Sequence, residues 1–526
     1  MPGLLPENSW RADQSLQRLL GAWLRPQTLA WAEPFLLEMG RAATAELQLW
    51  GDACERQPAA LLAFDGWGNR IDEVAYPHAW RRIAAVAARA GLVAIPYEPE
   101  TAARISAEAR LVQAALAYLF APSTATYLCP VAMTDGAARV LADFGSAGQR
   151  AETLPRLVSR EPEQAWTSGQ WMTERQGGSD VGRNAVIAKR DGDQWRLYGQ
   201  KFFCSNIGCE VALALARPEG AASGTRGLAL FLVPRDIDGH RNRYRIDRLK
   251  DKLGTRAMAT GEVTLDGAYA ELVGELDRGF AQMTGMLNVT RLHNAITAAA
   301  TMRRACMLVA AYGAQREAFG RKLEEHALFS EVLSDLRAEA DGALYLTMRM
   351  AQLLGRIETN QASQAEVLLF RLGIALAKLY TAKQAVGVVS EAIECFGGQG
   401  YMEDTGLPRL LRDAQVLPIW EGTTNVLSLD ALRVLHKPET LEAIDAELAR
   451  LDAPDRTCVI DQARSSVFDD ARASERGARR LAYALGRSWM VGLLREAGLG
   501  GQVTGGGSGH HSRGLNDLIH GDPFVR

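Results

Sequence analysis

The sequence predicts an α+β protein in which helical and β-rich domains follow one another along the chain. Apolar residues recur every three or four positions up to about residue 165 and again after Gly279, whereas short alternating runs fill the segment between. No strand is followed by G-x-G-x-x-G, which disfavours a Rossmann dehydrogenase. We therefore predict an N-terminal α-helical domain (1–165), a middle antiparallel β domain (166–275), a C-terminal four-helix bundle (276–436) and a helical extension with a tail (437–526).

The composition excludes several broad classes of protein. Of 526 residues, 47% are hydrophobic and 23% charged, with 59 Lys+Arg against 62 Asp+Glu, which fits neither a disordered chain nor a strongly basic binder. The seven cysteines contain no C-x-x-C and the eight histidines no H-x-x-x-H, so a disulfide framework, a structural zinc site and a catalytic zinc are all disfavoured. We expect no metal and a reducing, cytoplasmic location.

Two segments bear on targeting and membranes. The N-terminus carries Pro2, Pro6 and Glu7, where a signal peptide needs an unbroken apolar core. Residues 111–134 contain no charge, but two prolines and a Ser/Thr run interrupt them. We expect a buried helix over 111–120 followed by a turn, and no membrane span.

The individual elements follow from local spacing. Apolar residues at helical spacing around Trp80–Ala87 predict amphipathic helices, so that the first third is mainly α. In the middle third, apolar runs between Asp-Gly and Pro-containing breaks predict strands over Val186–Lys189, Trp195–Tyr198, Ala212–Ala216 and Leu228–Val233.

Long antiparallel helices are expected after Gly279. Helical spacing holds from Val332 to Leu344 and from Leu372 to Ile393, up to the break at Phe396–Gly398. Residues 437–500 continue the helical pattern, and Gly500–Gly509 is a glycine-rich linker to a polar tail.

Two stretches in or near the β segment carry residues suited to chemistry. Trp171–Val181 contains consecutive glycines followed by Ser179, which let backbone N–H groups and a hydroxyl approach a phosphate or pyrophosphate. A glycine-rich turn between domains is the alternative. Gly199–Asn206 places aromatic faces and a hydroxyl at a strand end, where a plain core strand is the alternative.

Three further stretches lie in the predicted bundle. Arg316–Gly320 sets a cation and an aromatic residue three positions apart at a helix end, which alone indicates a solvated charge and a packing Phe. Phe396–Tyr401 is a glycine-rich break. Leu411–Asn425 contains Glu421 between an aromatic residue and a glycine, a setting in which desolvation raises the pKa of a carboxylate, as a general base requires.

Together, in this order and spacing, the five stretches resemble the acyl-CoA dehydrogenase family of FAD flavoproteins over about residues 75–435. Members typically carry T-E-P-x-A-G-S-D, G-x-K-x-W-I-T-N, R-x-x-F-G, F-G-G-x-G, and R-D-A before E-G-T. The corresponding segments here are Thr173–Asp180, Gly199–Asn206, Arg316–Gly320, Phe396–Gly400 and Arg412–Thr423. The resemblance implies a helical bundle, β-barrel, helical bundle fold, and a homotetramer or dimer of dimers that shares FAD sites between subunits.

Within the family the sequence is most similar to the AidB-like, alkylation-response branch. The narrower match is carried by the C-terminal extension and by Glu174–Gly178, Leu128–Thr134, Pro77–Trp80 and Leu249–Gly254. Members of this branch are described as DNA-associated flavoproteins with weak dehydrogenase activity. The resemblance therefore supports the flavin more firmly than a physiological substrate.

The resemblance also assigns cofactor contacts. In the subunit's own FAD site they are Met172 and Thr173 at the pyrimidine and N5 edge, Gly178 and Ser179 near the pyrophosphate, and Phe203 and Ser205 where the family usually has Trp and Thr. In a neighbouring subunit's site, Arg316 and Phe319 reach the diphosphate and adenine, and Glu394, Gly397 and Gly398 line the adenosine side.

The resemblance places the catalytic base at Glu421. In the family's mechanism this carboxylate removes a proton α to a thioester carbonyl while a β hydride passes to flavin N5. Thr423 and Asn425 follow it and contact either the flavin or the neighbouring bundle. Arg291 falls where the family often has an Arg near CoA, although a helix-surface cation explains it nearly as well.

Three functions remain open at this point. They are an FAD-dependent acyl-CoA dehydrogenase-like oxidoreductase acting on a CH–CH group, a DNA-associated flavoprotein of the alkylation-damage response, and a flavin oxidase that uses O₂. The carboxylate at Glu421 favours chemistry, so we rank the dehydrogenase first, with an acyl-CoA or related thioester and an acceptor such as electron-transfer flavoprotein as partners. The arginines of 472–487 form either a phosphate-binding face or a solvated helix face, and the balanced net charge argues against tight DNA binding.

Overall fold

The computed structural model describes residues 3–468 and 470–499, so the predictions for the Gly500–Gly509 linker and for the polar tail lie outside the described residues. The chain separates into two compact units. The β unit comprises Glu46–Pro99 and Ser123–His293. The helical unit comprises the described residues up to Ala45, Glu100–Pro122 and the described residues from Asn294 onward.

The β unit combines a seven-stranded main sheet and two two-stranded sheets with helices. Its helices are α4 (Glu46–Arg56), α5 (His78–Arg89), α8 (Leu128–Phe144), α9 (Ala147–Glu152) and α10 (Leu154–Leu157). Its strands are β1 (Ala60–Phe64), β2 (Arg70–Ala75), β3 (Ser168–Trp171), β4 (Ile187–Asp191), β5 (Gln194–Ser205), β6 (Val211–Pro218), β7 (Ala229–Pro234), β8 (Asp236–Ile237), β9 (His240–Arg241), β10 (Tyr244–Leu249) and β11 (Thr260–Val273). Helices α6 (Pro99–Ile105) and α11 (Gly279–Gln315) cross the sequence limits of the units.

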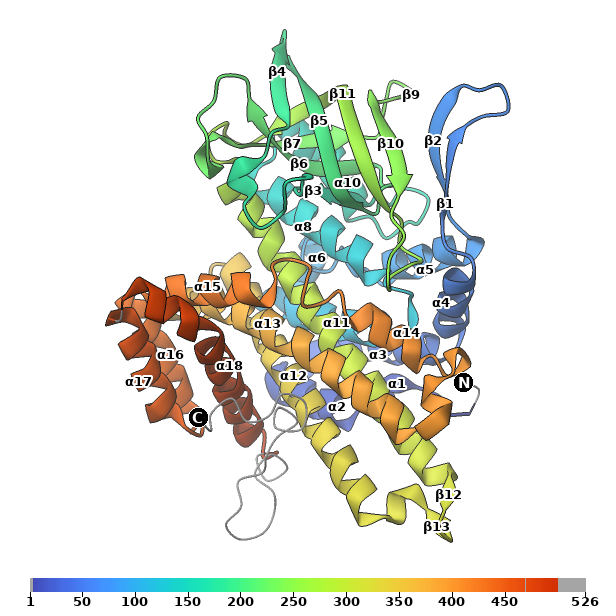
Figure 1. Cartoon of the computed structure of the whole chain (residues 1–526), viewed down its shortest axis with the longest axis vertical. Helices are drawn as coiled ribbons and strands as arrows, with labels where there is room; N and C mark the ends of the chain where they lie inside the picture. Colours follow the sequence, from blue (N-terminus) through green and yellow to red (C-terminus); the bar gives the residue numbers. More distant parts are fainter. Residues whose placement is uncertain (1–2, 469, 500–526) are drawn as a thin grey trace. The chain divides into compact units, whose positions relative to one another are not determined.

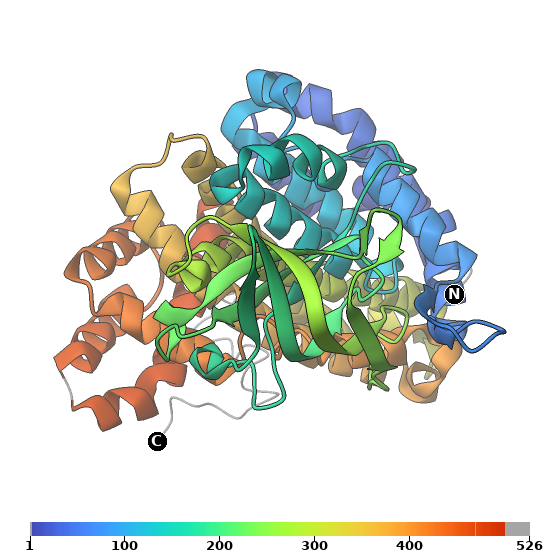
Figure 2. The same ribbon diagram turned by 90° about the horizontal axis from the view of Figure 1, so that it is seen from above.

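The main sheet runs in the order β10-β11-β5-β4-β6-β3, with β7 pairing to both β11 and β6. Figure 1 shows β4, β5, β11 and β10 side by side, and Figure 2 shows the same twisted strands from above. The expected antiparallel pairing is found throughout except at β6, which pairs in parallel with β3 and β4. The prediction of a wholly antiparallel domain was therefore wrong at this strand, because β3 reaches β6 through a long connection rather than a hairpin.

Strand β6 is buried on both faces. Leu213 and Leu215 pack into one apolar cluster with side chains of α8 and the start of α11, whereas Ala214 and Ala216 pack into a second cluster between strands. A strand covered on both sides reads as a continuous apolar run, which is what Val211–Ala216 shows.

A hairpin that the sequence analysis missed interrupts the helical first third. Strands β1 and β2 pair antiparallel, with Ala60 opposite Ala75. The turn is closed by Asp65, whose Oδ1 accepts hydrogen bonds from the backbone N–H groups of Trp67 and Asn69, both at 2.8 Å. The signal was Asp-Gly-Trp-Gly-Asn at 65–69, because Asp and Gly favour such turns.

The helical unit is built around long helices. Figure 1 shows α12 and α13 running alongside each other, with α15 to α18 beside them. Its elements are α1 (Ser9–Ala12), α2 (Gln14–Trp23), α3 (Pro26–Thr44), α7 (Ala109–Phe120), β12 (Glu317–Ala318), β13 (Arg321–Lys322), α12 (Ala327–Glu358), α13 (Gln364–Cys395), α14 (Leu407–Ala414), α15 (Thr424–Leu435), α16 (Pro438–Arg450), α17 (Arg456–Phe468) and α18 (Ala471–Glu496). The buried helix expected over 111–120 is confirmed as α7, and no helix among the described residues is long and apolar enough to cross a membrane.

The extension helix α18 packs directly into the bundle. A Cβ added at Gly342 of α12 would lie 2.3 Å from Met490 Sδ, and one at Gly373 of α13 would lie 2.8 Å from the Trp489 ring. A side chain at Gly373 would meet the rigid Trp489 ring, and one at Gly342 would force Met490 to move, so both glycines allow α18 to approach closely. Residues 471–496 are part of the bundle core rather than an appendage.

The bundle core contains a buried acid. Glu339 of α12 is buried and lies beside Tyr380 and Gln384 of α13, with the Arg487 cation of α18 nearby. Burial raises the pKa of Glu339 to about 7, and the hydrogen bonds and the cation only partly oppose this shift.

We expect Glu339→Gln to change how stability depends on pH. Folding raises the pKa of Glu339 from 4.5 to about 7. The contribution of the protonated side chain to the free energy of unfolding is therefore fully present below about pH 4.5 and is lost as the pH rises through 7. As the pH rises between those limits, the free energy of unfolding of the variant should therefore increase by about 3 kcal/mol relative to that of the wild type. Urea midpoints at about pH 5 and pH 8 measure this, with the exposed Glu442→Gln as control. Equal pH dependence in Glu339→Gln and wild type would contradict it.

Candidate functional site

The turn at Met172–Thr173 follows β3 and is fixed to the neighbouring strand. The Phe202 N–H of β5 donates to the Thr173 carbonyl at 2.9 Å, and Asn184 Nδ2 donates to the Met172 carbonyl at 2.8 Å. Met172 and Thr173 are half-buried, while Trp171 before them is buried. The Thr173 hydroxyl is thus carried on a turn whose backbone is restrained on both sides.

A buried ion pair lies under this turn. Lys201 is 0% exposed, and its Nζ lies 2.8 Å from Glu174 Oε1 and 2.7 Å from the Leu215 carbonyl. Glu174 also accepts backbone hydrogen bonds from Ala185 at 2.6 Å and Val186 at 3.2 Å. Burial lowers the pKa of Lys201, and the Glu174 carboxylate opposes this shift. The pair links the Thr-Glu and Gly-x-Lys stretches, a partnership that sequence reasoning did not identify.

The glycine pair next to this turn leaves an exposed ledge. A Cβ at Gly178 would lie 2.6 Å from Thr173 Oγ1, and Gly177 has φ +129°, so neither position accepts a side chain without strain. Gly178 and Ser179 are both exposed. Backbone N–H groups and a hydroxyl in such a place suit an anion such as a diphosphate.

The strand end of β5 presents an aromatic surface. Phe203 is 53% exposed and meets Phe202 edge to face at 5.1 Å, and the Lys250 ammonium lies 4.4 Å from the Phe203 ring centre. Ser205 Oγ lies 3.4 Å from Thr260 Oγ1. An exposed ring beside a cation is suited to stacking on a flat, electron-poor ring system.

A charge cluster that the sequence analysis did not assign a role lies beside Phe203. Glu262 accepts from Lys250 Nζ at 2.7 Å and from Arg248 Nη2 at 2.7 Å. These two cations lower the pKa of Glu262 to about 2. The carboxylate thereby fixes Lys250 against the aromatic pair.

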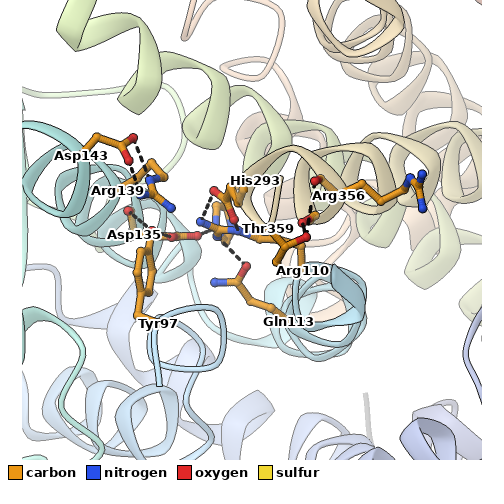
Figure 3. Close-up of polar contacts among 11 residues, drawn as sticks. Tyr97, Arg110, Gln113, Asp135, Arg139, Asp143, His293, Arg356 and Thr359 are labelled. Atoms are coloured by element: carbon orange, nitrogen blue, oxygen red, sulfur yellow. Dashed lines mark hydrogen bonds and ion pairs between the residues drawn. The ribbon is translucent and has the colours of Figure 1, made fainter. Parts of the chain in front are cut away.

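A second buried polar cluster in the β unit joins α8 and α11 (Figure 3). Asp135 Oδ2 lies 2.8 Å from His293 Nε2, and Tyr97 Oη donates to Asp135 Oδ1 at 2.7 Å. His293 is buried, whereas His78 is exposed and accepts a hydrogen bond from Arg82 Nε at 3.1 Å. Arg291, two residues before His293, is half-buried.

Figure 3 also shows Arg110 of the helical unit, which forms a bidentate pair with Glu358 at 2.6 and 2.8 Å and reaches Gln113 at 2.9 Å. Arg110 is buried, and its guanidinium is occupied by these partners. The pair ties α7 to the end of α12 and serves the bundle rather than a ligand.

The helical unit carries Glu421 on an unusual turn before α15. Glu421 has φ +57° and Gly422 φ +105°. A left-handed backbone is tolerated by Asn and Asp but is costly for Glu, and such strain gathers at functional sites. The φ of Gly422 favours glycine there, and a Cβ would also lie 3.0 Å from Leu427. Thr423 and Asn425 are exposed on the same turn and helix start.

The hairpin after α11 carries Arg316 and Phe319. Arg316 directly follows the end of α11, as expected for a helix end, and strands β12 and β13 form a two-stranded turn beyond it. Phe319 is 98% exposed with φ +53°. An exposed aromatic side chain held away from its own bundle fits a contact with another chain or ligand.

The end of α13 lies against the end of α11. Phe396 stacks on Tyr312 with ring centres 4.1 Å apart. Glu394, Gly397 and Gly398 are exposed just beside this contact, and no heavy atom lies within 4 Å of a Cβ built at Gly398. The structure thus brings the Arg316 hairpin and the Phe396 turn to one end of the bundle.

Within each unit some of the expected site residues lie together. In the β unit Thr173 contacts Gly178 and is bonded to the backbone next to Phe203, and in the helical unit Glu421, Thr423 and Asn425 share one turn. Of the five arginines at 472–487, four are exposed, and Arg479 among them also contacts Asn425, whereas Arg487 is half-buried and lies near Glu339.

Comparisons with known proteins match three consecutive parts of the chain, which together reach residue 436. Family models match residues 1–164 (adaptive response protein AidB N-terminal domain), 169–268 (acyl-CoA dehydrogenase, middle domain) and 277–436 (acyl-CoA dehydrogenase, C-terminal domain). Acyl-CoA dehydrogenase family member 11 of Caenorhabditis elegans is 42% identical over 444 residues, covering 82% of this chain and 72% of the relative. The chain belongs to the acyl-CoA dehydrogenase family.

A second relative and a solved structure show where this chain lies within the acyl-CoA dehydrogenase family. The putative acyl-CoA dehydrogenase AidB of Escherichia coli is 35% identical over 418 residues, covering 77% of this chain and 75% of the relative. A crystal structure of C. elegans ACDH-11 in complex with C11-CoA superposes with a TM-score of 0.89 at 38% identity, covering 94% of this chain and 88% of that one. The AidB-like resemblance and the helical, β, helical fold are confirmed, and the chain is an oxidoreductase of this family.

Proposed function

We propose that the protein is an FAD-dependent acyl-CoA dehydrogenase that oxidises the α–β bond of an acyl thioester. The observation that carries the proposal is Glu421, a carboxylate held in a left-handed turn within a family whose chemistry begins with proton abstraction. The C11-CoA bound to ACDH-11 supports an acyl-CoA as the class of substrate.

The residues of the β unit fit the flavin. Thr173 supplies a hydroxyl on a restrained turn, Gly178 and Ser179 supply an exposed anion ledge, and Phe203 supplies a stacking ring beside Lys250. Met172 and Ser205 complete the set at the same turn and strand end. When bound, FAD supplies the hydride acceptor.

The helical unit supplies the base and a contribution to a second subunit. Glu421 removes the α proton, with Thr423 and Asn425 beside it. The exposed hairpin and bundle end are proposed to reach the FAD of a neighbouring subunit through Arg316, Phe319, Glu394, Gly397 and Gly398. A homotetramer, a cytoplasmic location and electron transfer to an electron-transfer flavoprotein belong to the same proposal, with Arg291 near the CoA.

We expect the protein to purify with non-covalent FAD and to be bleached by an acyl-CoA in the absence of oxygen. The test is anaerobic titration of the yellow protein with short-, medium- and long-chain acyl-CoA thioesters, followed by flavin absorbance. Free CoA is the control, because it has no α proton next to a thioester. A protein that takes up no FAD, or that holds FAD but is bleached by none of the thioesters, would contradict the proposal. In the second case a shift of duplex DNA would favour the DNA-associated function.

A further inference from the structure

A buried lysine donates a hydrogen bond to the turn that carries Glu421. Lys378 of α13 is 0% exposed, and its Nζ donates to the Gly422 carbonyl at 2.6 Å. Burying an ammonium group costs free energy unless the group is hydrogen-bonded, so Lys378 requires hydrogen-bond partners at this position. The lysine fixes the carbonyl directly after the residue proposed as the base.

The extension helix α18 holds the other side of the same turn. Arg479 Nη1 donates to Asn425 Oδ1 at 3.4 Å. Tyr483, one helical turn further along α18, lies near the side chains of Thr424 and Arg479. Residues 424 and 425 open α15, so α18 contacts the first turn of the helix that follows Glu421.

The two anchors are connected within the bundle. The Tyr483 ring lies 6.0 Å from the ring of Tyr380, which follows Lys378 by two positions on α13. Arg479 also lies over the Tyr483 ring, at 5.8 Å from its centre. Helices α13 and α18 therefore hold Gly422, Thr424 and Asn425 from two directions.

The turn needs this external support. Glu421 and Gly422 are both in left-handed backbone, and Thr423, the N-cap residue of α15, makes no capping hydrogen bond with its side chain. A helix start without its own cap leaves backbone N–H groups that other contacts must hold in place. The backbone of the turn that carries Glu421 is therefore held in part by the contacts of residues 422–425.

We propose that α18 is a positioning element of the active site, in which Arg479 and Tyr483 hold the Thr424–Asn425 turn so that Glu421 keeps its direction toward the α proton. This inference rests on the function proposed for Glu421. It gives the C-terminal extension a part in dehydrogenation and gives Arg479 a role other than binding nucleic acid.

The test compares Arg479→Gln and Tyr483→Phe with Arg480→Gln, an exposed neighbour on the same helix. Anaerobic flavin reduction is measured over a range of the acyl-CoA that bleaches the wild type best. We expect the two α18 variants to lower the limiting rate about 10- to 100-fold, because a small misplacement of a reacting group has effects of this size. The half-saturating concentration, the FAD content and the melting temperature should stay as in the wild type, and Arg479→Lys should recover most of the rate.

A second measurement does not depend on activity. Hydrogen exchange of the backbone over residues 419–428 should be faster in Arg479→Gln and Tyr483→Phe than in Arg480→Gln. Unchanged exchange together with unchanged rates would overturn the inference, as would a loss of rate accompanied by equal loss of FAD and melting temperature. A wild type that no thioester bleaches would contradict the proposed function instead, while the exchange result still decides whether α18 holds the turn.

Discussion

Replacing Glu421 by glutamine is expected to leave FAD bound and to slow flavin reduction by an acyl-CoA by about 10²- to 10⁴-fold, the range usual for loss of a general base. The amide has nearly the same shape as the carboxylate and cannot accept the α proton. The backbone at φ +57° carries the same strain for either residue, so the turn itself should be preserved. The loss therefore reports on proton abstraction.

Stopped-flow reduction under anaerobic conditions measures this effect, with FAD content determined from the same samples. The control is Glu439→Gln, which makes the same chemical change at an exposed position at the start of α16. If Glu421→Gln is reduced as fast as the wild type, another group takes the proton and the assignment of Glu421 is wrong. If FAD is lost as well, the turn has a structural role that the substitution disturbs.

Replacing Lys201 by methionine is expected to destabilise the β unit by about 3–5 kcal/mol, because it leaves the Glu174 carboxylate buried without its cation. Glu174 also holds the backbone of residues 185 and 186, and Lys201 reaches the Met172 carbonyl at 3.4 Å. Loss of the pair should therefore loosen the turn that carries Thr173 and weaken FAD retention.

Urea unfolding and FAD release by dilution measure the two effects. The matched control is Arg196→Met on the same strand, which breaks an exposed pair with Asp191 and should change stability by less than about 1 kcal/mol. Similar small losses for both variants would show that the buried pair is replaceable by apolar packing. Full stability of Lys201→Met with normal FAD content would contradict the role of the pair in holding the turn.

The sequence by itself determined the order of the segments. Hydrophobic period changes near residue 166 and again after Gly279, and helices α13 and α7 lie where the spacing placed them, with α13 ending at the Phe396–Gly398 break. These features depend on residues a few positions apart, which is the range over which periodicity reports burial. The motif residues were assigned by resemblance to the acyl-CoA dehydrogenase family, which was recognisable because each stretch is short and contiguous.

Only the tertiary structure decided which distant residues meet. Glu174 pairs with Lys201, Lys378 with the Gly422 carbonyl, and Arg479 with Asn425, across 27, 44 and 54 positions of sequence. The parallel pairing of β6 and the burial of α18 against Gly342 and Gly373 are likewise contacts between segments remote in sequence. A single arginine or lysine has the same local pattern whether it faces water or a buried carbonyl. Its partner is chosen by the packing of whole helices and strands, and no local spacing records that choice.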